Sequence, residues 1–569
     1  MNNTSAYRAL LCTLLSAGFS VAASGQGSDP RAAVVLTGHD LSVDEVVRVA
    51  RGLAPVRVEP AAMARVERSH RLLLLAAKNG QPIYGLNRGV GIDRDKQVFR
   101  AGALDPDVRR GSERFNRDLL RSHSAAVGPD APEEAVRAAL LARLNTMLYG
   151  ATGARPAVAE MYVEMLNRHI HPVLPSRGSI GEADIGVLAH VGLAMMGEGD
   201  VMVEGRRMNA DVALRQAGLT PLVPFAKDGL SIMSSNAYAA GIAALMVSDV
   251  KRLLDQGEVV AALALEGLNG NVAPLLEPVQ RVRPYPYQMA AAARMRSALE
   301  GSYLWQPDPR RSLQDPLSFR TASQVYGLAR AQTDALEQGI ATQLNASDDN
   351  PAVLLDVAPA ADTPAAVRPF YIREGDLFGA VIPTANFEPT AWASRVEALG
   401  MALASVSASS AQRSVRLQNA SLTGLRMLLA PSDSAIGLEV VQLPVLVLDA
   451  EIRELSVPVH ADASSAAGGV EDVASNGAAI VDRTARVVDD LRYVIGMELM
   501  HAAQAVDLRR RAAQMSSPNA VPALGRSTGE LLDAYRRDVG FLDRDRVQTE
   551  DIRKTSDFLR RRASVGLSR

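Results

Sequence analysis

The chain has 569 residues, of which 61 are Lys or Arg and 63 are Asp or Glu, so its formal net charge is only −2. This balance argues against nucleic acid or an anionic membrane as a partner, because both select strongly basic surfaces. Hydrophobic residues make up 47% of the chain and aromatic residues only 4%, a composition that fits closely packed long helices better than sheets.

The first 24 residues have the pattern of a secretory signal peptide. A single positive charge, Arg8, precedes an apolar run from Ala9 to Ala23, and small residues follow at a plausible cleavage site. Such a segment is removed on export, so we expect a periplasmic or secreted protein. The alternative is a wrongly assigned upstream start codon on a cytoplasmic enzyme. Cys12 is the only cysteine and would leave with the peptide, so no disulfide is expected.

Three further regions follow the signal peptide. Residues 30–230 are expected to form a mixed N-terminal domain, with a strand candidate at Val34–Thr37. Residues 231–510 are expected to form a bundle of long helices, because apolar residues recur there at spacings of three and four. Residues 511–569 are strongly charged and are expected to form a helical segment that faces solvent or another subunit. The predicted fold class is therefore mainly α, with a smaller mixed N-terminal part.

The clearest helical stretches are Val325–Leu344, Val396–Val406 and Ile480–Val494. The first ends at a run of capping and breaking residues that closes with Pro351. We assign all three apolar stripes to the protein core and expect the helices to pack as a bundle. His169 and His171 have no third ligand in register, so no metal site is predicted.

The stretch from Leu174 to His190 organises the functional interpretation. Its segments Gly178–Gly181 (Gly-Ser-Ile-Gly) and Leu188–His190 (Leu-Ala-His) resemble the two halves of the signature of the histidine, phenylalanine and tyrosine ammonia-lyases. This family carries Ala-Ser-Gly-Asp between the halves, and the triad cyclises into a methylidene-imidazolone electrophile. Here the chain reads Glu182-Ala183-Asp184, so the triad has no counterpart. The resemblance implies a lyase that works without this electrophile, and no cofactor is predicted.

The resemblance extends over most of the chain and supplies candidate catalytic residues one at a time. Ile83–Asn87 looks like the loop whose tyrosine, here Tyr84, acts as the general base beside the substrate's β-carbon. A tyrosine gives up its proton reluctantly, with a reference pKa of about 10, and Arg88 is the candidate positive neighbour. Asn87 is a candidate substrate contact. The alternative for Tyr84 is a turn residue whose hydroxyl is satisfied by the loop.

Further matches concern substrate binding. His123 falls in the stretch that selects the substrate's ring, where a polar residue favours an imidazole or a hydroxylated ring; a packing role is the alternative. Arg320 matches the arginine that clamps the substrate carboxylate, and Gln314 matches the amide beside it. Leu317, however, stands where the family has a tyrosine in the site.

Four more positions are compared with the family. Ser234 replaces an asparagine that supports the electrophile, and Ala237 replaces a glutamine. Asn386 opens a shortened form of the motif Asn-Phe-His-Gly-Glu-Pro. Glu471 matches the acidic residue that faces the substrate's amino group, although a carboxylate at a helix N-terminus is the alternative. We take Glu471 as catalytic, and Ser234 and Asn386 as substrate contacts.

The missing electrophile constrains the leaving group. A base strong enough to remove a β-proton first deprotonates a primary ammonium, whereas a quaternary ammonium has no N–H to lose and leaves as a neutral amine. Glu182 and Asp184 place negative charge where a fixed cation would bind. The pattern looks like the ergothionases within this family, and it predicts elimination of trimethylamine from an aromatic betaine such as ergothioneine, giving a conjugated acrylate. The alternatives are a lyase or cyclase acting on another β-substituted aromatic acid, and a secreted pseudoenzyme that binds aromatic zwitterions.

The family resemblance also implies an assembly. It predicts a homotetramer whose active sites combine residues of three chains, with Tyr84, Arg320 and Glu471 contributed by different subunits. The expected partner is a small aromatic betaine, with neither nucleic acid nor membrane.

Overall fold

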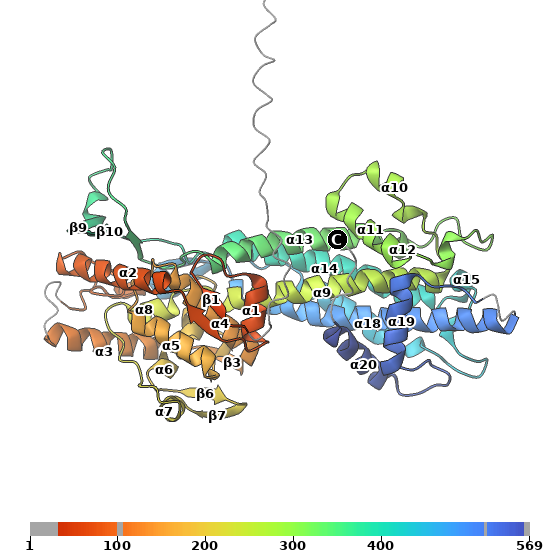
Figure 1. Cartoon of the computed structure of the whole chain (residues 1–569), viewed down its shortest axis with the longest axis horizontal. Coiled ribbons are helices and arrows are strands. Elements are labelled where there is room, and N and C mark those ends of the chain that lie inside the picture. The colour runs from red at the N-terminus through yellow and green to blue at the C-terminus, as the bar shows by residue number, and fades with distance from the viewer. Residues whose placement is uncertain (1–31, 100–105, 517–520, 563–569) are drawn as a thin grey trace, which may run out of the picture.

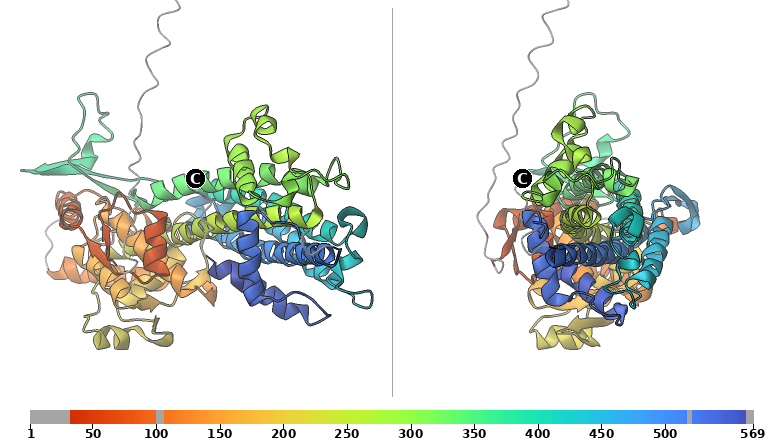
Figure 2. Two further views of the ribbon diagram at one scale, coloured as in Figure 1. Left: turned by 45° about the vertical axis from the view of Figure 1, so that its right-hand side comes forward. Right: turned by 90° about the vertical axis from the view of Figure 1, so that its right-hand side faces the viewer.

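The computed structural model describes residues 32–99, 106–516 and 521–562. The molecule is elongated, with an N-terminal region at one end and long helices that run toward the other (Figure 1). Two further views show the same arrangement (Figure 2). The prediction of a mainly α fold is confirmed. The predicted signal peptide, residues 1–24, lies outside the described residues.

Four long helices form the centre of the bundle. They pack mainly as the pairs α9 with α18, α14 with α18, and α13 with α14. Their facing sides consist largely of buried Ala, Val and Leu, as the apolar stripes predicted. The bounds of these helices are α9 (Ala237–Leu268), α13 (Ala322–Leu344), α14 (Thr390–Leu417) and α18 (Gly477–Ser516).

The three helical stretches predicted from the sequence are confirmed as parts of α13, α14 and α18. α13 ends at Leu344, directly before the predicted breaking run. The predicted domain boundary after residue 510 falls within α18. The charged C-terminal residues form α19 (Arg526–Asp538), which packs on α9, and α20 (Gln548–Arg561), which packs on α18.

Shorter helices complete the bundle, and α16 packs against both α14 and α18. Three short strands form an antiparallel sheet in the order β8-β10-β9, which lies at the N-terminal end of the molecule (Figure 1). The remaining elements after α9 are α10 (Glu277–Arg281), α11 (Pro286–Ala298), α12 (Leu317–Arg320), β8 (Ala352–Leu355), β9 (Tyr371–Glu374), β10 (Leu377–Ile382), α15 (Ala420–Thr423), α16 (Gln442–Leu455), β11 (Asp462–Ser465), α17 (Ala466–Gly469) and β12 (Glu471–Ala474).

The N-terminal region combines helices with short strands. The predicted strand at Val34 is β1, which pairs in parallel with β2. β3 pairs with β5, and β4, β6 and β7 form a third small sheet. The elements are β1 (Val34–Leu36), α1 (Val43–Ala50), β2 (Val56–Val58), α2 (Pro60–Lys78), α3 (Pro106–His123), β3 (Val127–Asp130), α4 (Glu133–Leu148), α5 (Pro156–Asn167), β4 (Ile170–Pro172), β5 (Pro175–Arg177), α6 (Ile185–Met195), β6 (Asp200–Val203), β7 (Arg206–Asn209), α7 (Ala210–Gln216) and α8 (Asp228–Met233).

Helix α9 connects this region to the bundle, because α4 packs along its first half. Gly241 permits the close approach of the two helices, since a Cβ atom there would lie 2.7 Å from the carbonyl carbon of Ala138. The segment Asp228–Leu268 is apolar and long enough to span a membrane, but 94% of its most apolar window is buried inside the protein. Its hydrophobicity is thus accounted for by its place in the core.

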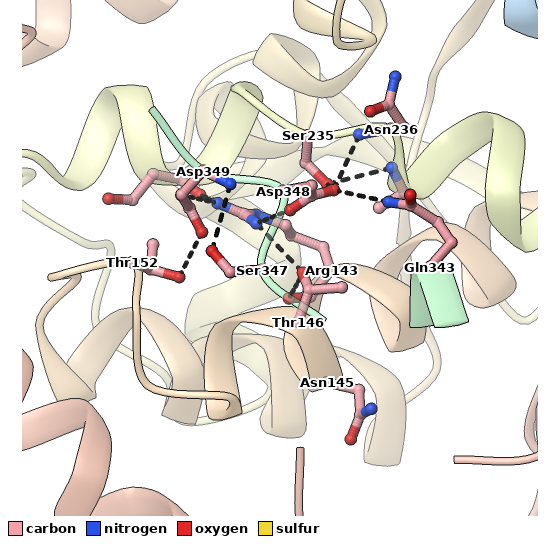
Figure 3. A network of polar contacts seen from close by, with 12 residues as sticks. Arg143, Asn145, Thr146, Thr152, Ser235, Asn236, Gln343, Ser347, Asp348 and Asp349 are labelled. Carbon is pink, nitrogen blue, oxygen red and sulfur yellow. Dashed lines mark hydrogen bonds and ion pairs between the residues drawn. The ribbon is translucent and has the colours of Figure 1, made fainter. Parts of the chain in front are cut away.

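A buried ion-pair network joins α4 to the segment after α13 (Figure 3). Arg143 is fully buried, and its guanidinium nitrogens lie 2.9 Å from Oδ1 of both Asp348 and Asp349. Burial by itself would raise the pKa of Asp349, but Arg143 and the nearby Lys227 hold the pKa of this carboxyl below its ordinary value. Asp349 is therefore an ionised partner of Arg143.

The same network fixes the turn between α8 and α9. Ser235 Oγ donates a hydrogen bond to Asp348 at 2.6 Å, and the Asn236 backbone N–H donates to the same carboxylate at 3.0 Å (Figure 3). Arg143 Nε donates to the Ser231 carbonyl oxygen at 2.8 Å. The position of the first turn of α9 thus depends on this cluster of charges.

We expect Arg143→Met to lower the free energy of unfolding by about 3–5 kcal/mol, because it leaves two buried carboxylates without their partner. Chemical denaturation would measure the change. A matched control is Arg168→Met, which removes an exposed pair with Glu164 and should cost less than about 1 kcal/mol. Equal losses in the two variants would contradict a structural role for the buried network.

Candidate active site

Three segments that lie far apart in the sequence meet at the signature region. Asn476 N donates to the Ile180 carbonyl oxygen at 2.8 Å, and Asn236 Nδ2 donates to the Gly181 carbonyl oxygen at 2.9 Å. The loop after α2 joins them, because a Cβ atom on Gly468 would lie 2.7 Å from the side chain of Ile92. The candidate site is therefore built around the beginnings of α6, α9 and α18.

Gly181 sets the geometry of the signature turn. Its φ is +95°, and a Cβ atom there would lie 2.0 Å from Ser475 Oγ and 2.6 Å from the backbone nitrogen of Gly477. Real Cβ atoms do not approach backbone this closely, and L side chains rarely adopt this φ. Only glycine lets the signature turn lie against the start of α18.

Asp184 is fully buried directly before α6. Its two carboxylate oxygens accept hydrogen bonds from Ser179 Oγ at 2.8 Å and from Ala239 N at 2.9 Å. Burial raises the pKa of Asp184 to about 6, even though these hydrogen bonds act in the opposite direction. The predicted substrate contact thus uses its carboxylate to tie the signature turn to the first turn of α9.

Glu182 belongs to a group of three carboxylates that we call the acidic cluster: Glu182, Glu388 and Glu471. Burial raises the pKa of Glu182, and the charges of Glu388 and Glu471 raise it further, while the neighbouring Ser475 lowers it. Glu182 is 8% exposed. A cation placed beside these carboxylates would relieve their mutual repulsion.

Tyr84 lies within reach of the charge of Glu471, one member of the acidic cluster. Its hydroxyl oxygen accepts a hydrogen bond from Gly91 N at 3.0 Å. Burial is the main cause that raises the pKa of Tyr84, and the charge of Glu471 adds to it, whereas the Gly91 N–H and Arg94 lower it. In the free protein the phenol therefore holds its proton more firmly than an exposed tyrosine does.

The comparisons with known proteins agree with this arrangement. A family model described as aromatic amino acid lyase matches residues 41–537. The chain belongs to the aromatic amino acid lyase family. It is accordingly a carbon–nitrogen lyase, as the sequence predicted.

Several family members are similar over nearly their whole length. Histidine ammonia-lyase of Gloeobacter violaceus is 32% identical over 535 residues, which cover 92% of this chain and 95% of that protein. The crystal structure of ergothionase from Treponema denticola, in complex with desmethyl-ergothioneine sulfonic acid, has a TM-score of 0.81 and 37% identity, covering 93% of this chain and 98% of that chain. Tyrosine aminomutase from Streptomyces globisporus has a TM-score of 0.79 and 28% identity, with 93% and 97% covered.

The segment that carries Glu471 lies near the Tyr84 loop within one chain. Tyr84 and Glu471 were expected from different chains, but the charge of Glu471 acts on Tyr84 within a single chain. The physical reason is that the segment around α17 folds back onto the loop after α2, where Ala467 lies 3.4 Å from the Cβ position of Gly91.

The loop that carries Tyr84 is held by its own residues. Asn87 Oδ1 accepts from Ile83 N at 2.8 Å, and Asn87 Nδ2 donates to the Gln81 carbonyl oxygen at 2.9 Å. Both ends of this amide are therefore engaged within the loop. The positive group whose charge reaches Tyr84 is Arg94, whereas the Arg88 guanidinium donates to the Asp95 carbonyl oxygen at 3.4 Å.

His123 and Ser234 lie beside the signature region. His123 ends α3, with Nδ1 2.9 Å from the Leu119 carbonyl oxygen, and its own carbonyl oxygen lies 3.8 Å from the Cβ position of Gly186 in α6. Its Nε2 has no hydrogen-bond partner among the described residues. Ser234 ends α8 at 6% exposure, and its N–H donates to the Leu230 carbonyl oxygen at 2.9 Å.

Arg320 and Gln314 contact each other but lie away from Tyr84. Arg320 Nε donates to the Asp315 carbonyl oxygen at 2.8 Å, and the guanidinium also contacts Gln314 Oε1. Their helix, α12, lies in the half of the molecule opposite to α2 and the Tyr84 loop (Figure 1). One chain therefore does not bring the predicted carboxylate clamp and the predicted base together.

Two residues of the site, Glu388 and Arg94, had no assigned role in the sequence analysis. Asn386, a predicted contact, lines a cavity of about 680 Å³ together with Glu388, and Glu388 also belongs to the acidic cluster. The shortened motif that contains both residues was the available signal for Glu388. Arg94 had no comparable signal, because only the folded loop places its charge near Tyr84.

We expect opposite shifts in the pH dependence of turnover when the two charges near Tyr84 are removed. A base must be deprotonated to act, so kcat/KM rises with pH up to the pKa of Tyr84. Glu471 raises this pKa and Arg94 lowers it. Glu471→Gln should therefore move the rising limb to lower pH, and Arg94→Gln should move it to higher pH.

The measurement is the profile of kcat/KM against pH for each variant, in which only the position of the limb is compared. Arg88→Gln is the matched control and should leave that position unchanged. If neither Glu471→Gln nor Arg94→Gln moved the limb, Tyr84 would not be the group that titrates.

Proposed function

We propose that the protein eliminates trimethylamine from an aromatic betaine such as ergothioneine and releases a conjugated acrylate. The observation that carries this proposal is the acidic cluster beside Tyr84, at the place where the family builds its electrophile. None of the three carboxylates forms an ion pair with a residue in the described part of the chain, so together they suit a substrate that brings a permanent positive charge. The similarity to a protein described as an ergothioneine degrading enzyme supports the same reaction.

The signature turn does not fit the methylidene-imidazolone group. Only Glu182 and Ala183 stand between Gly181 and Asp184, so the turn contains no Ala-Ser-Gly triad. The nearest serine, Ser179, is followed by a β-branched isoleucine and donates its hydroxyl hydrogen bond to Asp184 at 2.8 Å. We infer that the enzyme works without this electrophile.

The proposed reaction balances without an added reagent. The Tyr84 phenolate takes the β-proton and becomes the neutral phenol, the C–H electron pair becomes the new Cα–Cβ double bond, and the C–N pair leaves with nitrogen as a neutral tertiary amine. The acidic cluster would hold the quaternary nitrogen before the bond breaks. Arg320 would bind the substrate carboxylate through a paired N–H contact, and His123 Nε2 would face the ring.

Arg320 reaches such a site only from a second chain, so the proposal includes a shared active site in a homotetramer. Exposed apolar residues support an interface around α12, because Leu313 in the preceding loop and Leu317 at the start of the helix are 86% and 65% exposed. On α16, Leu443, Leu446 and Val447 form an exposed stripe at helical spacing. Patches of this kind on a folded chain are typical of subunit contacts.

We also propose export to the periplasm or the medium, on the basis of the N-terminal pattern alone. N-terminal sequencing of secreted protein tests this directly. An intact Met1 in that material would exclude cleavage near Ala23.

We expect trimethylammonium substrates to react and primary amines to remain unchanged. Ergothioneine, its sulfur-free analogue hercynine, histidine, tyrosine and phenylalanine would be incubated with the protein. The readouts are a new conjugated acrylate chromophore and the released amine. The histidine ammonia-lyase relatives make free histidine the informative control, because its turnover at a comparable rate would exclude the leaving-group argument.

The mass of the intact protein provides a separate control for the same experiment. Formation of the methylidene-imidazolone removes two waters, so the measured mass should equal that of the unmodified mature chain. A loss of two waters would overturn the inference that the electrophile is absent, whatever substrate is turned over.

We expect Tyr84→Phe and Arg320→Ala to restore each other's activity when the chains are mixed. Tyr84→Phe alone should lower the rate by roughly 10² to 10⁴ because it removes the general base. Arg320→Ala alone should lower both affinity and rate because the carboxylate is no longer oriented. After unfolding and joint refolding in equal amounts, about a quarter of the shared sites would combine two intact residues.

The measured quantity is the activity of the mixture relative to each variant refolded alone. Mixing two preparations of Tyr84→Phe is the control and should give no gain. If the mixture is no more active than the separate variants, then either Tyr84 and Arg320 act in one site from the same chain, or one of them does not belong to the active site.

A further inference from the structure

A second cavity lies where the N-terminal region meets the helix bundle. Its volume is about 590 Å³, and its walls come mainly from α4, α9, α18 and the end of α20. It lies behind the first turn of α9, whose residue Tyr238 lines it, while Ala239 of the same turn holds Asp184 of the candidate active site. Cavities of this size at the junction of two structural units are typical of small-molecule sites.

The charges in this cavity are almost all paired. Each of its four arginines, Arg51, Arg252, Arg492 and Arg560, forms an ion pair with a carboxylate. None of them is therefore free to bind an anionic ligand without breaking an existing pair.

Asp482 and Tyr238 are the exceptions. Asp482 is exposed in the cavity wall and forms no ion pair among the described residues. Tyr238 is only 4% exposed, yet its hydroxyl has no hydrogen-bond partner in the described part of the chain. The two residues line the same cavity, and the charge of Asp482 contributes, after burial and Asp184, to a raised pKa of the Tyr238 hydroxyl. Because Tyr238 lines the cavity, this hydroxyl is open to a ligand or a water there.

An apolar wall continues from these two residues. Ile242, Leu245 and Met246 follow Tyr238 along one side of α9, and Val488 follows Asp482 along α18. A ligand at this place would meet a negative charge and an aromatic ring at one end and an apolar surface along its body.

We propose that this cavity binds a small organic cation, a trialkylammonium with an apolar body. Asp482 pairs with the positive charge, the Tyr238 hydroxyl lies beside it, and the wall of α9 contacts the apolar body. This site is separate from the acidic cluster and does not depend on the proposed betaine elimination. Because Tyr238 belongs to the first turn of α9, the ligand contacts the element that also holds Asp184.

The test measures the binding of benzyltrimethylammonium by ligand-observed NMR titration, without any readout of activity. Glu182→Gln with Glu471→Gln serves as the starting protein, so that the acidic cluster does not contribute a second cation site. In this background, Asp482→Asn should weaken binding on the order of tenfold, the effect of about 1.4 kcal/mol. Asp533→Asn, at an exposed position on α19, is the matched control and should leave the affinity unchanged.

Two further measurements separate the charge from the shape of the site. The neutral carbon isostere neopentylbenzene should bind more weakly than the cation, and Ala485→Trp, which fills the cavity, should abolish binding of both. Thermal unfolding would verify that each variant is folded. Unchanged affinity in both Asp482→Asn and Ala485→Trp, equal binding of the neutral isostere, or no binding to the starting protein would overturn the proposal.

Discussion

The guanidinium of Arg143, shared between Asp348 and Asp349 in the buried interior, determines where the long helix α9 begins. Removing such charges from water is costly, and the cost is offset only when every partner is in place. The acceptors of Arg143 and the donors to Asp348 come from four separate parts of the chain. Through Ser235 and Asn236, which bind both this cluster and the signature turn, the geometry of the candidate site follows from a salt bridge that no substrate touches.

The site differs from its surroundings in how far its charges are neutralised by opposite charges. In the Arg143 network, opposite charges are matched within hydrogen-bond distance. In the acidic cluster, burial and then the like charges of Glu388 and Glu471 raise the pKa of Glu182, and only Ser475 acts against them. A folded protein retains such repulsion when something binds there. The contrast between a neutralised interior and an uncompensated site is the physical basis for expecting a cationic substrate.

Local patterns predicted the elements well. The sequence predicted the apolar stripes of α13, α14 and α18 and the breaking run after Leu344, because helix periodicity and capping depend on neighbours in sequence. The sequence did not predict that Glu471 lies near Tyr84 or that Arg94 lowers the pKa of Tyr84. Both effects depend on how the folded chain brings distant segments to the Tyr84 loop. The positions of Arg320 and Tyr84 in opposite halves of one chain likewise became visible only in three dimensions.

The contact between Gly181 and the start of α18 limits how this enzyme can be engineered. Converting it into an ammonia-lyase of the usual kind would require one more residue in a turn whose ends are both fixed, by Ser475 and Gly477 on one side and by the Asp184 hydrogen bonds on the other. Even a single Cβ atom at Gly181 would collide with the backbone of Asn476 and Gly477. A design that places the Ala-Ser-Gly triad in this turn would therefore have to rebuild the start of α18 at the same time.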